Sequence, residues 1–202
     1  MKTKVILFAV LGVVGLAVLI LGGSAIGSYN DLVTKREEIR GRWSEVENQL
    51  QRRADLINNL VETVKGITKQ EQEVFVKIAE ARSRLLSANT PQEKIAANEQ
   101  LDNALRSGGL ITTGGNVNVL ALQERYPELR SSENFRALQF EIAGTENRLA
   151  VARRDYNLAV AAYNTARSQF PTVLVAGLMG FNREDSYFRA EEGSRQAPQV
   201  KF

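Results

Sequence analysis

The sequence predicts an all-α protein, and three observations carry that prediction. The chain opens with an uncharged apolar stretch whose length suits a membrane-spanning helix. Two later stretches repeat apolar residues every three or four positions, the spacing of helices that pack like a coiled coil. Proline and glycine signals separate these stretches. We therefore expect an N-terminal transmembrane helix, followed by an antiparallel helical bundle with two long coiled-coil-like helices and shorter helices.

Residues 5–28 form the expected membrane span, after a short N-terminal tail of residues 1–4. No charged side chain occurs between Val5 and Asn30, and the apolar run suits a hydrocarbon core of about 30 Å. A cleaved signal peptide is the alternative, because Gly23-Ser24-Ala25 resembles a cleavage site. The run is longer than an ordinary signal-peptide core, which favours an uncleaved signal-anchor.

The orientation of this span depends on the lysines and arginines that flank it. Lys2 and Lys4 stand close to its N-terminal end, whereas the cations on the other side begin only at Lys35. The positive-inside rule counts basic residues near both ends. It favours a soluble part that lies outside the cytoplasm.

The first long helix is predicted over residues 29–88. With Trp43 taken as heptad position a, twelve of the fourteen a and d positions are apolar, which predicts a continuous packing seam. The two exceptions are Arg53 and Glu71. Gly66 lies inside this helix and weakens it by about 1 kcal/mol, which by itself does not end it.

A shorter helix and a loop are predicted next. Thr90, Pro91 and Glu93 supply an N-cap, a proline at the first helical position and a capping-box glutamate, which together start a helix over residues 91–106. Residues 107–118 are glycine-rich. They lack the lysine and the spacing of a P-loop, so we expect no phosphate site there.

The second long helix is predicted over residues 133–169 and completes a bundle of residues 29–170. Its heptad positions alternate large residues such as Ile142 with small ones such as Ala152. Small residues let a facing helix approach closely, and the first seam is the natural partner. The two seams can therefore satisfy each other within one chain.

The composition limits the classes of function. The chain has no cysteine and no histidine, which excludes disulfides, thiolate nucleophiles, zinc sites built on these residues and a histidine phosphorelay. The commonest general base at neutral pH is also absent, so we expect no enzyme, no cofactor, no metal and no small-molecule substrate. The net charge of +3 arises from intermixed acidic and basic residues, which argues against nucleic acid as a partner.

Arg53 places a permanent cation on the packing seam of the first long helix. It cannot pair with Glu71, because the two lie about 27 Å apart along a helix. The structural interpretation is that Arg53 fixes the register of the facing helix. Candidate partners there are Tyr156, Tyr163, Glu146 and Asp155. The alternative is a binding surface for a partner beside Arg53, made of Arg52, Asp55, Asn58 and Asn59.

Residues 171–202 comprise an apolar segment and a C-terminal tail. The stretch from Phe170 to Phe181 carries no charge, yet it is too short to span a bilayer. It can cap the core, contact another subunit or dip into the lipid surface, with its two phenylalanines as interfacial anchors. The candidate contacts are Phe170, Val173, Leu174, Val175, Leu178, Met179 and Phe181. In the tail, Val200 and Phe202 are candidates for recognition by strand addition to a partner domain.

Several stretches resemble the LemA family of bacterial proteins. They include "RGRWSEVENQLQRRADLINNLVETVKG", "ENRLAVARRDYN" and "VAGLMGF", and the resemblance covers nearly the whole chain from Tyr29 onward. It implies one N-terminal membrane segment, a helical bundle, a location in the bacterial inner membrane and no defined molecular activity. Asn58 departs from the family pattern, in which proline is common at this position.

These observations together predict a membrane-anchored, non-enzymatic scaffold or adaptor of the cell envelope. Its expected partners are the lipid bilayer and either a second copy of the chain or a membrane protein. The alternative is a protein that binds the lipid surface through residues 170–181 and shapes the membrane or responds to envelope stress.

Overall fold

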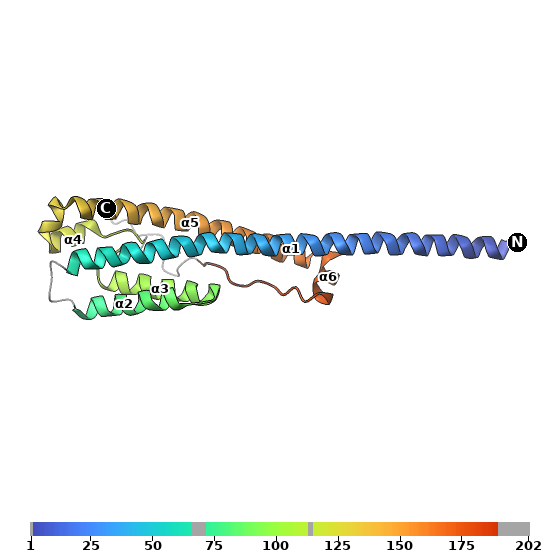
Figure 1. The fold of residues 1–202 in the computed structure, drawn as a ribbon, viewed down its shortest axis with the longest axis horizontal. Coiled ribbons are helices and arrows are strands. Elements are labelled where there is room, and N and C mark those ends of the chain that lie inside the picture. The colour runs from blue at the N-terminus through green and yellow to red at the C-terminus, as the bar shows by residue number, and fades with distance from the viewer. Residues whose placement is uncertain (1, 66–71, 113–114, 190–202) are drawn as a thin grey trace, which may run out of the picture. The chain divides into compact units, whose positions relative to one another are not determined.

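A computed structural model describes residues 2–65, 72–112 and 115–189, and every regular element in these ranges is helical (Figure 1). The elements are α1 (Lys2–Lys65), α2 (Gln72–Ser87), α3 (Pro91–Ser107), α4 (Val119–Arg125), the 3-10 helix η1 (Pro127–Ser131), α5 (Glu133–Ser168) and α6 (Thr172–Leu178). Extended pairing in the described ranges is limited to an isolated bridge between Ile111 and Val117. The all-α prediction is confirmed.

The chain divides into two compact units. Unit 1 consists of Met1–Gly41 and Leu158–Asp185, and unit 2 consists of Arg42–Asn157 and Ser186–Phe202. The long helices α1 and α5 each contribute residues to both units.

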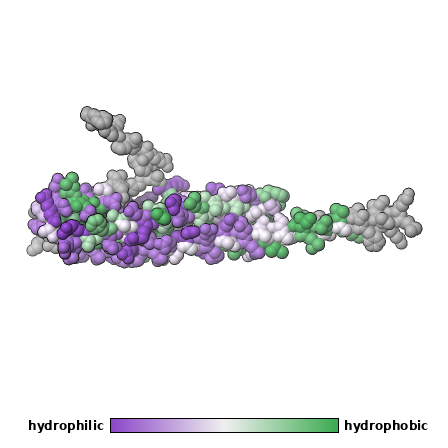
Figure 2. Space-filling view, turned by 90° about the horizontal axis from the view of Figure 1, so that it is seen from above, coloured by the Kyte–Doolittle hydropathy of each residue, from purple (hydrophilic) through white to green (hydrophobic). Residues whose placement is uncertain are grey.

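The N-terminal part of α1, in unit 1, can cross a bilayer by its length and composition, as no other helix among the described residues can. Its described large apolar side chains, from Leu11 to Ile26, are all exposed. Figure 2 shows hydrophobic residues along this part of the helix, whereas the bundle surface in view is mainly hydrophilic. A helix that presents apolar residues to its surroundings without a protein partner suits a lipid environment.

In unit 2, α1 and α5 run antiparallel. Arg52 of α1 pairs with Glu141 of α5, and Trp43, farther toward the start of α1, packs on Tyr156, farther along α5. Most of the described seam positions that the sequence predicts are buried here. They include Val46, Leu50, Ile57, Leu60 and Val64 of α1, and Phe135, Ile142, Leu149 and Ala152 of α5.

The first long helix differs from the one predicted over residues 29–88. Arg82 Nε of α2 donates a hydrogen bond to the carbonyl oxygen of Ala54 at 3.0 Å, although 28 residues of continuous helix would separate them by about 42 Å. The chain therefore reverses direction between α1 and α2. The heptad pattern continues through this reversal because α2 has its own apolar face, on which Phe75 and Ile78 are buried. The pattern cannot reveal that the two apolar faces belong to separate helices.

The N-terminus of α3 has the cap that its sequence predicts. The Thr90 side chain accepts the backbone N–H of Glu93 at 3.2 Å, and the Glu93 carboxylate accepts the backbone N–H of Thr90 at 3.2 Å. The glycine-rich loop after α3 contributes to the core, because its apolar side chains are buried. These side chains are Leu110, Ile111 and Val117.

Candidate functional site

A buried ionic cluster joins three helices of unit 2 around Arg53. Its guanidinium is 1% exposed and belongs to α1. One terminal nitrogen, Nη1, donates to Oδ1 of Asn98 on α3 at 2.6 Å. The other, Nη2, is bonded to Oδ1 of Asp102 on α3, and Nε forms an ion pair with Oε1 of Glu146 on α5. The planar guanidinium thus presents separate nitrogens to α3 and α5.

The cluster holds one cation between two carboxylates. Burial lowers the pKa of the Arg53 guanidinium, but the attraction of Asp102 and Glu146 outweighs it, so the pKa lies above its ordinary value. Burial raises the pKa of Glu146 above 4.5; Arg53 opposes this increase and Asp102 adds to it. The main cause of the raised pKa of Glu146 is therefore its burial, which disfavours the ionised carboxylate.

The glycine-rich loop covers Glu146. Gly115 has a φ of +79°, which side chains other than glycine rarely adopt. A Cβ on this residue would also lie 3.0 Å from Oε2 of Glu146. The loop thus approaches the carboxylate at a point where only glycine fits without strain. Because the charged groups of the cluster pair with one another and lie largely out of water, this arrangement supports a structural role, in which Arg53 sets the relative level of α1, α3 and α5.

The register hypothesis named four candidate partners for Arg53, and one of them, Glu146, is in contact with it. The Tyr163 hydroxyl donates to the carbonyl oxygen of Asn182 at 2.8 Å, within unit 1. Tyr156 packs its ring on Trp43 with centroids 5.2 Å apart. Asp155 accepts from its neighbour Arg154. Glu71 lies outside the described residues.

The two partners that α3 supplies to Arg53 were not among the predicted ones. Asn98 and Asp102 are buried among Ala97, Leu101 and Leu105 on one face of α3. The signal was a pair of polar residues four positions apart inside an apolar helical stripe, where their side chains lie one turn from each other. Asn98 Nδ2 donates to Oδ2 of Asp102 at 3.2 Å, so these two residues form a pre-arranged acceptor for the arginine.

The proposed partner surface beside Arg53 is divided between neighbouring helices. Arg52 reaches Glu141 of α5 at 2.6 Å, whereas Asp55 lies 3.3 Å from Arg82 of α2. Of the two amides, Asn58 is half-buried and Asn59 is exposed. The two charged residues thus bridge helices of the bundle, and their side chains remain more than half exposed.

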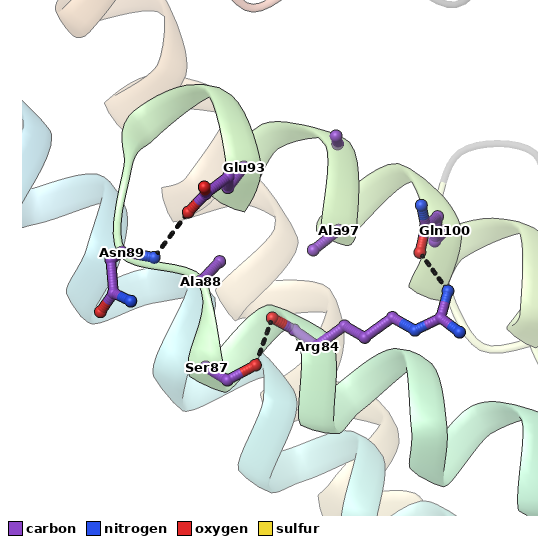
Figure 3. Close-up of a pocket in the computed structure, with 8 residues that line it drawn as sticks. Arg84, Ser87, Ala88, Asn89, Glu93, Ala97 and Gln100 are labelled. Carbon is purple, nitrogen blue, oxygen red and sulfur yellow. Dashed lines mark hydrogen bonds between the residues drawn. The ribbon is translucent and has the colours of Figure 1, made fainter.

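The connection between α2 and α3 forms an open cavity of about 490 Å³. Figure 3 shows Arg84 bonded to Gln100 across it, with Glu93 accepting the backbone N–H of Asn89. Hydrogen bonds from the backbone of Asn89 and Thr90 lower the pKa of Glu93, as expected for a capping-box carboxylate. These polar groups stabilise the connection between α2 and α3, so their arrangement is explained without a ligand.

The apolar segment of unit 1 has a mixed exposure. Phe170, Val173, Leu174, Leu178 and Met179 are exposed, and we call these five residues the α6 patch. Val175 and Ala176 are buried.

Phe181 is buried, which fits the interpretation of the apolar segment as a cap on the core and contradicts, for this residue, the alternative of an interfacial anchor. Its ring is 5% exposed, packs edge-on against Tyr29 with centroids 5.6 Å apart, and lies under the guanidinium of Arg36 at 4.9 Å. Tyr29 and Arg36 lie in the part of α1 that follows the predicted span, so Phe181 holds the end of the apolar segment to that helix. The candidate recognition residues Val200 and Phe202 lie outside the described part of the chain.

The replacement Glu146→Gln is expected to change the pH dependence of stability. A carboxyl whose pKa is raised on folding stabilises the protein fully below pH 4.5, and this contribution is lost as the pH rises through the raised pKa. The variant should therefore become more stable relative to the natural chain as the pH rises above 4.5. Urea unfolding at a series of pH values, followed by the fluorescence of the single tryptophan, measures this difference.

Glu141→Gln is the matched control, because its expected effect on the pH dependence of stability has the opposite sign. A side-chain hydrogen bond from Arg52, followed by the charge of that arginine, lowers the pKa of Glu141. Its contribution is present above pH 4.5 and is lost as the pH falls through the lowered pKa. Parallel pH profiles for the two variants would contradict the assignment of Glu146 as the unfavourably buried carboxyl.

Comparisons with known proteins point to one family. A family model described as "LemA family" matches residues 42–202. The chain is 26% identical over 180 residues to the magnetosome protein MamQ of Magnetospirillum gryphiswaldense, covering 82% of this chain and 66% of that protein. It is 26% identical over 179 residues to the magnetosome protein MamQ 2 of Paramagnetospirillum magneticum, covering 80% and 64%.

A third relative is the protein LemA of Metamycoplasma hominis. It is 24% identical over 152 residues, which cover 75% of this chain and 64% of that protein. The chain thus spans slightly less than two thirds of the length of these relatives. The family match covers all of the residues that form the ionic cluster and the α6 patch.

Proposed function

Given that the chain belongs to the LemA family, we propose that it is a membrane-anchored, non-enzymatic scaffold of the bacterial cell envelope. In this proposal the N-terminal part of α1 spans the bilayer, and the α6 patch holds the adjoining part of unit 1 against the lipid surface. The helical bundle is then available to a second copy of the chain or to a membrane-protein partner. The exposed α6 patch is the observation that carries the proposal.

Two large apolar side chains of the α6 patch are mostly exposed. Phe170 is 79% exposed and Leu178 is 85% exposed. Each large apolar side chain that leaves water contributes about 1.5–3 kcal/mol when it is fully buried. A cluster of such residues on one short segment therefore favours an apolar surface as its neighbour.

The position of the α6 patch favours lipid as that surface. Thr172, the first residue of α6, has its hydroxyl 3.3 Å from the hydroxyl of Ser28 on α1. Ser28 stands at the end of the predicted span, and no charged residue occurs from Phe170 to Phe181. A helix fixed at that level with an apolar surface meets the boundary between headgroups and acyl chains. The scaffold would then touch the membrane at two places.

A fluorophore on α6 is expected to report contact with lipid. The chain contains no cysteine, so Leu178→Cys gives a single site for an environment-sensitive label on the full-length protein in lipid vesicles. The label should show blue-shifted emission and strong quenching by lipids that carry a quencher in their acyl chains. Lipid contact buries the label in the apolar boundary, which is the reason for both effects.

Leu120→Cys is the matched control. Leu120 is 70% exposed and lies on α4, a seven-residue helix of the same length as α6, but in unit 2. A label there should keep the emission of a water-exposed fluorophore. Water-like emission at both positions would refute the proposed contact between α6 and the bilayer.

A further inference from the structure

A short C-terminal segment of unit 2 occupies a site built from three helices. The segment is Ser186–Phe188, and it has no regular secondary structure. The ring of Phe188 stacks on Trp43 of α1 with centroids 6.1 Å apart and meets Tyr156 of α5 edge-on at 5.9 Å. Arg153 places its guanidinium carbon 5.2 Å from the centroid of the same ring. We call Trp43, Arg153, Tyr156 and Asn157 the aromatic slot.

Asn157 of the aromatic slot binds the main chain of the segment. Its side-chain Nδ2 donates to the carbonyl oxygen of Phe188 at 2.9 Å, and its Oδ1 accepts the N–H of Phe188 at 3.0 Å. This pair of bonds recognises an extended backbone whatever the side chain, in the way that strand addition does. The rings and the arginine select an aromatic side chain. Gln92 of α3 adds a hydrogen bond from its Nε2 to Oγ of Ser186.

The segment belongs to no helix or strand that would have to melt if it left the slot. Side chains hold it and the residue Glu184 just before it: Asn157 and Gln92 bind the segment, and Asn164 binds the backbone of Glu184. Ser186 is buried, whereas Phe188 is only half-buried. The slot, by contrast, lies on α1 and α5, and its geometry does not depend on the segment being part of the same chain.

We propose that the aromatic slot also accepts Ser186–Phe188 of a second copy, so that neighbouring copies in the membrane exchange these segments. The proposal rests on the proposed function, because membrane anchoring is what confines the copies to one plane and raises their effective concentration. A second copy is the occupant that the observations favour, since its segment has the same side chains and backbone as the segment seen in the slot. Exchange of an identical element is a low-cost route to self-association. Phe188 of each copy would then complete the slot of the other.

Cross-linking of two different single-cysteine chains tests the exchange. One full-length chain carries Gln92→Cys and the other carries Ser186→Cys, at positions whose side chains are in hydrogen-bond contact. The two chains have different tags and are co-expressed in the same membrane, which is then treated with a short bis-maleimide. Because each chain has only one of the two cysteines, a heterodimer joined between positions 92 and 186 is expected only if segments are exchanged.

Two controls make the result decisive. Glu99→Cys replaces Gln92→Cys in a matched pair, since residue 99 is also exposed on α3 but lies about 10 Å farther along that helix, and this pair should give no heterodimer. A single chain with both Gln92→Cys and Ser186→Cys shows whether the reagent joins the two positions within one copy. Internal cross-linking of that chain without heterodimers in the mixed membrane would overturn the exchange, and so would failure to join positions 92 and 186 in either arrangement.

Phe188→Ala should abolish the heterodimer, because the slot loses the ring that it binds. Phe170→Ala, in the α6 patch, should leave it unchanged. This second variant separates the two proposals, since a failure of α6 to contact lipid alters the fluorescence experiment on Leu178→Cys and not the cross-link. Heterodimer formation that persists in Phe188→Ala would show that the slot is not the contact.

Discussion

Replacing Arg53 with alanine is expected to lower the free energy of unfolding of unit 2 by about 3–5 kcal/mol. The replacement removes the cation that Asp102 and Glu146 share, and leaves two largely buried carboxylates without it. An uncompensated charge in an enclosed site is among the most destabilising changes a single substitution can make. Arg53→Lys should recover only part of the loss, because an ammonium group lacks the planar fork that reaches both α3 and α5.

Urea unfolding followed by tryptophan fluorescence measures this effect in unit 2. Trp43 is the only tryptophan of the chain and lies against Tyr156 in that unit. The neighbouring Arg52→Ala is the matched control: its side chain is 54% exposed and pairs with an exposed carboxylate, so water screens the interaction and little change is expected. Similar midpoints for the two alanine variants would reject the view that Arg53 is a buried structural cation.

Phe181→Ala is expected to destabilise unit 1 by about 3–5 kcal/mol, the usual range for removing a buried phenylalanine ring. The ring is nearly fully buried between Tyr29 and Arg36, and its loss leaves a cavity beside α1. A hydrogen bond to its backbone is also affected, because the side-chain Nε of Arg167 donates to the carbonyl oxygen of Phe181 at 2.7 Å. Hydrogen exchange of the α6 amides in detergent-solubilised protein should accelerate accordingly.

Phe170→Ala is the control that the same apolar segment provides. Phe170 is 79% exposed, so its removal should change the stability of unit 1 by no more than about 0.5 kcal/mol in either direction. It should instead weaken the contact of α6 with lipid. Equal acceleration of exchange in the two variants would show that the burial of Phe181 does not hold α6 to α1.

The packing seam could be predicted from the sequence, because helical periodicity assigns each residue to a side of its own helix. Leu50, Ile57 and Leu60 are buried where the heptad places them, and so are Ile142 and Leu149 on α5. Local signals were equally informative. The cap of α3 is encoded by neighbouring residues, and the predicted span by an uninterrupted apolar run.

Periodicity does not identify what lies opposite a side chain. The sequence placed Arg53 on the seam but suggested the wrong helix for most of its contacts, since Asn98 and Asp102 are 45 and 49 residues away on α3. The reversal between α1 and α2 brings α3 into the bundle, and the continuous heptad pattern concealed that reversal. The partners of Arg53 could therefore not be predicted, because no local sequence pattern indicated this change of chain direction.

The sequence by itself determined the helices, their apolar sides and the segment able to enter a membrane, because these depend on neighbouring residues and on the hydrophobicity of single stretches. Only the tertiary structure decided which apolar residues of the segment near α6 face inward. Phe170 and Phe181 have the same side chain in the same uncharged stretch, yet one is exposed and the other is buried under Arg36. Burial depends on contacts between distant parts of the chain, so two identical residues acquire different roles only when the chain has folded.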